Sequence, residues 1–175
     1  MKKLKELVIL YPSFERGGAT NNLINFMEYC LKQNLKLTLV SNIKKNDFFF
    51  KNKKKNIKLV NLENHYFINN SSRFITSLNS IFKLIPLLKT CKKDSSIFLS
   101  FQSHILPIII CKIFSQKIII RNSEDPHDAT KYADNKLSAV ITLLFKFIFY
   151  RFADGIITNS RKSKQSLQKI VKNEI

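Results

Sequence analysis

The 175-residue sequence predicts a doubly wound α/β domain with a mainly parallel sheet. Short apolar runs alternate with longer segments in which apolar residues recur every three or four positions, the pattern of strands followed by helices. The first apolar run, at residues 4–11, shows no alternation of polar and apolar side chains, as expected of a strand covered on both faces. Hydrophobic residues make up 45% of the chain, enough for the core of one domain of this length.

Each strand is expected where a short apolar run lies between polar or turn-forming residues. The six runs span residues 4–11, 35–40, 57–62, 97–101, 117–120 and 155–158. With helices between them, they predict a Rossmann-like sheet with right-handed crossovers.

Helical periodicity fills the segments between these strands. The first helix begins at Thr20, and its apolar stripe consists of Leu23, Phe26, Met27, Cys30 and Leu31. A second stripe consists of Phe74, Leu78, Ile81, Phe82, Ile85 and Leu88. Ser71 and Ser72 are expected to cap this second helix, and Pro86 to kink its last turns.

Three more segments predict helices in the second half of the chain. Residues 105–114 form a short apolar helix that Pro107 interrupts, and Ser160 caps a final helix that buries Leu167. Residues 137–152 are apolar on almost every side. This pattern favours a helix sandwiched within the protein, with contact to a membrane or to a missing partner domain as the alternative.

The composition favours a cytoplasmic protein without a metal site. Cys30, Cys91 and Cys111 are far apart and odd in number, which indicates buried thiols in a reducing compartment rather than disulfides or a metal-binding pair. His65 and His127 have no acidic or cysteine partner at ligand spacing. The first residues lack the hydrophobic region of a signal peptide, and no run of about 18 apolar residues indicates a membrane span.

The formal net charge of +18 predicts attraction to anionic partners without specifying which. Residues 44–55 combine many lysines with the aromatic triplet Phe48, Phe49 and Phe50. This stretch fits attachment to an anionic membrane at the inner face, and a solvated loop is the alternative. Aromatic side chains between cations also fit nucleic-acid binding, but no recognised nucleic-acid-binding motif accompanies them, so nucleic acid is not the expected partner.

Gly17 and Gly18 are the most informative pair of residues, because they follow the first strand and precede the first helix. A residue without Cβ permits a tight turn and lets a ligand approach backbone N–H groups. The N-terminus of the following helix favours a phosphate. A plain tight turn is the alternative.

In doubly wound sheets, ligands bind beyond the carboxyl ends of the strands, where the strand order switches. Gly17 and Gly18, His104 and residues 121–125 all follow predicted strands and are therefore expected at that edge. His104 can exchange hydrogen bonds with a hydroxyl group, or it is a loop histidine without chemistry. Asp154 is expected to serve a helix end and strand entry rather than to act as a nucleophile.

Three motifs occur in a recognisable order along the chain. They are Gly-Gly-Ala before the first helix, Arg-Asn-Ser-Glu-Asp-Pro after the fifth strand, and Tyr-Arg-Phe-Ala-Asp-Gly-Ile-Ile-Thr-Asn-Ser near the end. Together they resemble the N-terminal, acceptor-side domain of family-four glycosyltransferases, which are two-domain retaining enzymes that use a nucleotide-diphosphate sugar. The resemblance spans essentially the whole chain.

The resemblance implies roles for specific residues. It places Gly17 and Gly18, helped by Arg16, against the donor diphosphate. It places Arg121 and Glu124 near the acceptor and the sugar, where the Arg121 guanidinium can counter phosphate charge and the Glu124 carboxylate can accept bonds from sugar hydroxyls. A histidine that relatives often carry in this segment is missing here, and Glu124 capping the next turn is the alternative.

The resemblance also implies a second domain after this one, with a paired-glutamate signature that holds the donor, and nothing in the sequence corresponds to it. The expected function is therefore the acceptor-binding half of a glycosyltransferase. It would move a sugar from a nucleotide-diphosphate donor to a glycan or lipid-linked acceptor in lipopolysaccharide or capsule assembly. The fragment, split-enzyme and inactive-remnant alternatives stay open, and a basic membrane or nucleic-acid module without catalysis is the alternative function.

Overall fold

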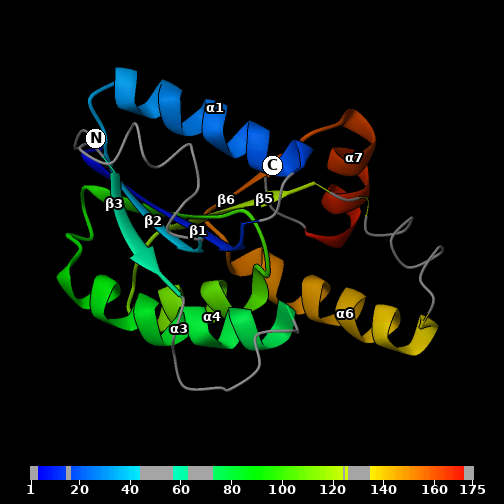
Figure 1. The fold of residues 1–175 in the computed structure, drawn as a ribbon. Coiled ribbons are helices and arrows are strands. Elements are labelled where there is room, and N and C mark those ends of the chain that lie inside the picture. The colour runs from blue at the N-terminus through cyan, green and yellow to red at the C-terminus, as the bar shows by residue number, and fades with distance from the viewer. Residues whose placement is uncertain are drawn as a thin grey trace.

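The computed structural model describes residues 4–14, 17–43, 57–62, 73–123, 125 and 135–171. These residues form one α/β domain whose parallel, six-stranded sheet has the order β3-β2-β1-β4-β5-β6 (Figure 1). The predicted doubly wound, Rossmann-like fold is therefore confirmed. Two predictions lie outside the described residues: the basic and aromatic stretch at residues 44–55, read as a membrane contact or a solvated loop, and the helix caps Ser71 and Ser72.

The elements follow the predicted alternation closely. The strands are β1 (Glu6–Ser13), β2 (Lys36–Asn42), β3 (Ile57–Asn61), β4 (Ser96–Ser100), β5 (Ile118–Asn122) and β6 (Gly155–Thr158). The helices are α1 (Gly18–Lys32), α3 (Arg73–Thr90), α4 (Ile105–Ile113), α6 (Lys136–Phe149) and α7 (Arg161–Ile170), and the short 3₁₀ helix η1 (Tyr150–Phe152) follows α6.

Strand β1 lies inside the sheet, and both of its faces are covered. Val8 and Leu10 pack into one hydrophobic cluster, whereas Leu7, Ile9 and Tyr11 pack into the other. This alternation of two apolar sets explains why residues 7–11 are apolar at every position, whereas Lys5 and Glu6 precede the covered part of the strand.

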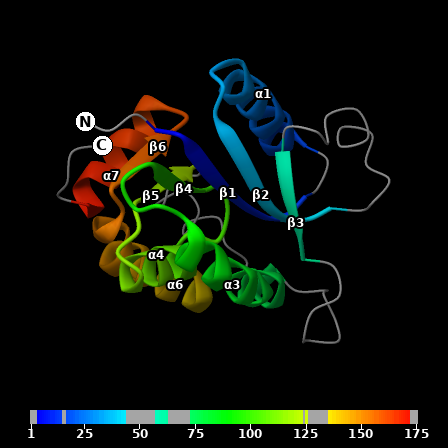
Figure 2. The same ribbon diagram turned by 90° about the vertical axis from the view of Figure 1, so that its left-hand side faces the viewer.

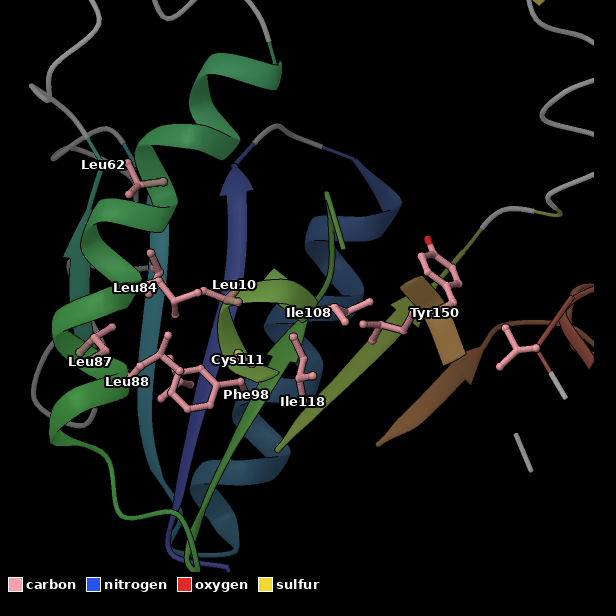
Figure 3. Close-up of a cluster of buried hydrophobic side chains, with 14 of the residues drawn as sticks. Leu10, Leu62, Leu84, Leu87, Leu88, Phe98, Ile108, Cys111, Ile118 and Tyr150 are labelled. Atoms are coloured by element: carbon pink, nitrogen blue, oxygen red, sulfur yellow. The ribbon is translucent and has the colours of Figure 1, made fainter. Parts of the chain in front are cut away.

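The two clusters correspond to the two helical layers. Helix α1 covers one face of the sheet, and α3 and α4 cover the other, as Figures 1 and 2 show. On the α3 and α4 side, Leu84 and Leu88 belong to the same buried cluster as Phe98 of β4 (Figure 3). Helix α7 packs beside the edge strand β6.

The predicted buried face of α3 was partly wrong. The helix turns Leu84, Leu87 and Leu88 to the core, whereas Phe82 is 53% exposed. Apolar residues occur on several sides of this helix, so periodicity alone does not decide which side faces the sheet.

Pro107 does not interrupt α4, contrary to the prediction. It is the third residue of the helix Ile105–Ile113, where a backbone N–H would have no partner within the helix. The missing N–H of proline therefore costs no helical hydrogen bond at this position.

The prediction that residues 137–152 are sandwiched within the protein was wrong for the helical part. None of the residues of α6 is buried, and Leu137 is 72% exposed. The helix extends past α4 on the same side of the sheet (Figure 1), and of its side chains Leu143 packs against the core.

Other predictions of local structure were confirmed. The Ser160 hydroxyl accepts a hydrogen bond from the Ser163 N–H at 3.1 Å and so caps α7. Asp154 has a structural role, because its Oδ2 accepts bonds from the Ile118 N–H and the Lys112 ammonium, both at 2.7 Å. Cys30 and Cys111 are buried free thiols, whereas Cys91 is only half-buried.

Gln116 links the loop before β5 to the end of α3. Its Nε2 donates to the carbonyls of Leu88 at 3.0 Å and Cys91 at 3.1 Å, and the residue is 2% exposed. Carbonyls at a helix C-terminus have no partner within the helix, so this side chain satisfies groups that burial would otherwise leave unbonded.

We expect Gln116→Ala to lower the free energy of unfolding by about 1 kcal/mol, because the buried Leu88 carbonyl loses its donor, while removal of the buried Oε1 atom, which has no hydrogen-bond partner in the described part of the chain, offsets some of the loss. Urea unfolding checks this, with Gln168→Ala at an exposed position of α7 as the matched control. Equal stability of the two variants would contradict the assigned role of Gln116.

Candidate functional site

The candidate site lies at the carboxyl edge of the sheet, between β1 and β4. The strand order reverses there, because the chain proceeds from β1 outward to β2 and β3 and then returns to β4 on the other side of β1. The Ser13 N–H donates to Gln102 Oε1 at 3.2 Å and joins the ends of these two strands. Ligands of doubly wound sheets bind at such a reversal.

Gly17 and Gly18 stand at the start of α1, next to this edge. Gly17 is the N-cap residue, and its carbonyl accepts the Asn21 N–H at 3.1 Å. Its φ of 164° is extended backbone that any residue adopts, and neither glycine lies in the left-handed region that favours glycine. The predicted tight turn that needs glycine is therefore not what distinguishes this position.

Both glycines border open space. A Cβ built at Gly17 or at Gly18 would meet no atom within 4 Å beyond its chain neighbours. The first turn of α1 also carries N–H groups without helical partners and the positive end of the helix dipole. A small anion has room to approach these groups.

A path of side-chain contacts connects this turn to Arg121. The Tyr11 hydroxyl hydrogen-bonds Thr20 Oγ1 of the first turn at 2.9 Å, and the Tyr11 ring meets the Phe101 ring edge-on at 6.1 Å. The Arg121 guanidinium lies over the Phe101 ring, 5.1 Å from its centre. A cation–π contact of this kind holds a planar cation in place without neutralising its charge.

His104 lies on the same edge, at the end of β4 and the start of α4. Its Nδ1 is 2.9 Å from Ser100 Oγ, and its ring meets the Tyr150 ring edge-on at 5.8 Å. Burial of the ring lowers the pKa of His104 to about 3, and the positive charges of Lys146 and Arg121 add to this effect. The imidazole is therefore neutral at physiological pH.

The loop between β4 and α4 is held in an unusual conformation beside this histidine. Ser103 has a φ of 52°, in the left-handed region that residues with a Cβ seldom adopt. The Ser100 hydroxyl donates to the Gln102 carbonyl at 2.9 Å and closes the preceding turn. Local strain of this kind is often found where a loop presents side chains to a ligand.

The segment after β5 is fixed from two sides. The Tyr150 hydroxyl donates to Asn122 Oδ1 at 3.5 Å, and Asp125 Oδ2 accepts the Ser166 hydroxyl of α7 at 2.7 Å. Arg16 and Glu124, which the sequence analysis assigned to donor and sugar contacts, lie outside the described residues. The structure thus brings Gly17, Gly18, His104 and Arg121 to one edge.

Sequence reasoning missed three residues that shape this edge. Phe101 supports Arg121, Gln102 joins two strand ends, and Lys146 reaches from α6 toward His104. The sequence does single out Lys146, because it is the only charged residue between Lys136 and Arg151. Nothing in the sequence indicates the contacts of Phe101, since they depend on the register between strands.

Neither the models of known protein families nor the curated proteins contain a match to this sequence. Within the described ranges, no group of three or more His, Cys, Asp or Glu residues is placed to hold a metal ion. In the same part of the chain, no helix combines the length and apolar character needed to cross a membrane. The resemblance to glycosyltransferases therefore stays a prediction from motifs.

We expect His104 to make stability depend on pH. Its pKa in the folded protein is below its ordinary value of 6.5, so between pH 6.5 and about 3 the unfolded chain binds a proton that the folded chain does not. Stability should therefore fall as the pH is lowered below 6.5.

Urea unfolding of the wild type and of His104→Asn at pH 7.5 and pH 5 checks this, since the Asn amide can take the place of Nδ1 beside Ser100. The wild type should lose roughly 1–2 kcal/mol more than the variant on acidification. Equal losses in the two proteins would show that His104 is not held neutral.

Proposed function

We propose that this chain is the acceptor-side half of a glycosyltransferase that uses a nucleotide-diphosphate sugar. The single observation that carries the proposal is that the open N-terminus of α1 and an arginine held over Phe101 lie at the same edge of the sheet as the strand-order reversal. The order of the three sequence motifs supports the same assignment. The acceptor is a glycan or a lipid-linked sugar in the assembly of a cell-envelope polysaccharide.

In this proposal, the donor diphosphate binds to the backbone of the first turn of α1. The N–H groups of Gly17 and Gly18 face the diphosphate, and the absence of a Cβ leaves room for its oxygens. Arg121 adds a positive charge, and no carboxylate of the described residues forms an ion pair with it. Backbone donors and a fixed cation stabilise the negative charge that develops on a leaving diphosphate.

His104 serves the acceptor in this proposal. A neutral imidazole both donates and accepts hydrogen bonds, and this ring pairs with the Ser100 hydroxyl and with the Arg121 backbone, so in this proposal it fixes the edge at which the acceptor hydroxyl binds. The contacts with Ser100 and Tyr150 hold the ring in one orientation. Such positioning contributes to transfer by aligning the attacking hydroxyl with the sugar carbon.

A dinucleotide-binding function is less well supported. The loop after β1 reads Arg-Gly-Gly-Ala-Thr-Asn-Asn and does not contain the G-x-G-x-x-G spacing. That spacing provides the tight turn, the approach to a pyrophosphate and the close helix packing that dinucleotides require.

The proposal predicts weak donor binding by this chain alone, because the glycosyltransferases that its motifs resemble hold the nucleotide ribose and the sugar with a second domain. Titration with UDP, UDP-glucose and GDP-mannose should shift the backbone amide resonances of Gly17 and Gly18, with dissociation constants well above the low micromolar range. UMP, which has one phosphate fewer than UDP, should cause smaller shifts.

Arg121→Gln should weaken the binding of UDP about tenfold, which corresponds to the loss of one charge-assisted interaction. Lys117→Gln is the matched control, because Lys117 directly precedes β5 and this variant removes the same charge at the opposite end of that strand. An equal loss in both variants would indicate unspecific attraction to a basic protein. Low-micromolar binding by the chain alone would contradict the half-site proposal.

A further inference from the structure

We propose that the outer side of α6 binds the surface of an anionic lipid bilayer. This surface, here called the α6 face, consists of Leu137, Val140, Ile141, Leu144, Phe145, Phe147 and Ile148, each between 44% and 72% exposed. The inference does not depend on the proposed sugar transfer, because it rests on the exposure and charge of this helix alone.

The polarity of α6 is inverted relative to an ordinary surface helix. With successive residues about 100° apart, the α6 face covers an arc of about 160° along the length of the helix. On the opposite side, Leu143 packs against the core, and the half-buried Lys146 acts on His104. A surface helix of a water-exposed protein normally turns its apolar side inward.

The apolar surface is concentrated on this one helix. Of the twelve large hydrophobic side chains that are exposed in the described part of the chain, seven belong to α6. Single exposed apolar side chains need no explanation, but a contiguous set marks a surface that meets a membrane or another molecule.

The charges around the α6 face favour a lipid with a negative head group. Residues 136–153 contain Lys136, Lys146 and Arg151 and no Asp or Glu. At one end of the face lies the exposed Lys136, and just beyond the other end Arg151 lies over the Phe152 ring, 5.1 Å from its centre. Cations at both ends of an apolar face suit a helix lying in the plane of the bilayer, with cations at head groups and apolar side chains at the acyl boundary.

A second copy of the chain fits this surface less well. Joining two α6 faces would bring together two chains that each carry a formal charge of +18, with no carboxylate along the helix to offset the repulsion. An anionic bilayer is attracted by the same charge and needs no matching shape, because its acyl chains are fluid.

Docking on the α6 face would place the candidate site close to the lipid surface. Tyr150 directly follows α6, and its ring meets the ring of His104 at the carboxyl edge of the sheet, with ring centres 5.8 Å apart. A substrate anchored in that bilayer would therefore reach the edge without leaving the membrane surface.

Co-sedimentation with vesicles tests the proposal. The full chain should bind vesicles of phosphatidylglycerol and phosphatidylcholine and should bind pure phosphatidylcholine much less. Leu137→Ser with Leu144→Ser should reduce the partition coefficient about tenfold or more. Tyr29→Ser with Ile113→Ser removes two equally exposed apolar side chains from α1 and α4 and should change it less than twofold. An equal reduction in both double variants would overturn the proposal.

A fluorescence measurement covers the case in which the serine variants fold poorly. The chain contains no Trp, so Phe147→Trp places a single indole on the α6 face and Tyr29→Trp places one on α1. With anionic vesicles, the emission of the first variant should move to shorter wavelength and be quenched by brominated acyl chains, whereas that of the second should not change. Quenching in neither variant, or a dimer in solution that Leu137→Ser with Leu144→Ser dissociates while vesicle binding persists, would overturn the proposal.

Discussion

The pairing of β1 with β2 on one side and β4 on the other is the constraint on which the rest of the structure depends. With this pairing, the strand order reverses in the middle of the sheet, between β1 and β4. Helix α1 then lies on one face of the sheet and α4 on the other. The open first turn of α1 and the loop carrying His104 therefore meet at the same edge. Tyr11 reinforces this arrangement, because it contacts Thr20 of α1 and Phe101 after β4.

Much of the fold could be predicted because its signals are local. The strand Gly155–Thr158 was predicted with its observed bounds, since a glycine precedes a short apolar run and polar residues follow it. The buried stripe of α1 was recovered because polar residues occupy the other sides of that helix. The face of α3 was not, because Phe82 and Leu84 are equally apolar and only packing against the sheet selects Leu84.

The site could be predicted in its location and less well in its contacts. Glycines after the first strand and polar residues after later strands indicated the carboxyl edge, since parallel strands end on the same side. The stacking of Arg121 on Phe101 could not be predicted, because it depends on how β4 and β5 are aligned. One expectation about the glycines was wrong: the backbone at Gly17 is extended and does not require glycine, and a Cβ at this position would meet open space.

Helix α6 lies between the candidate site and the α6 face. Its inner side contributes the charge of Lys146 near a histidine that stays neutral, and its outer side is apolar and flanked by cations. A single helix that faces both the site and a lipid surface would allow a protein of high positive charge to act on substrates held at that surface.

The most direct test of the central claim is a crystal structure of the chain with UDP bound. The account predicts that the diphosphate lies within hydrogen-bonding distance of the backbone N–H groups at Gly17 and Gly18, with the Arg121 guanidinium as the nearest cation of the described residues. A diphosphate bound at the opposite edge of the sheet, near Lys5 and Lys117, would contradict it.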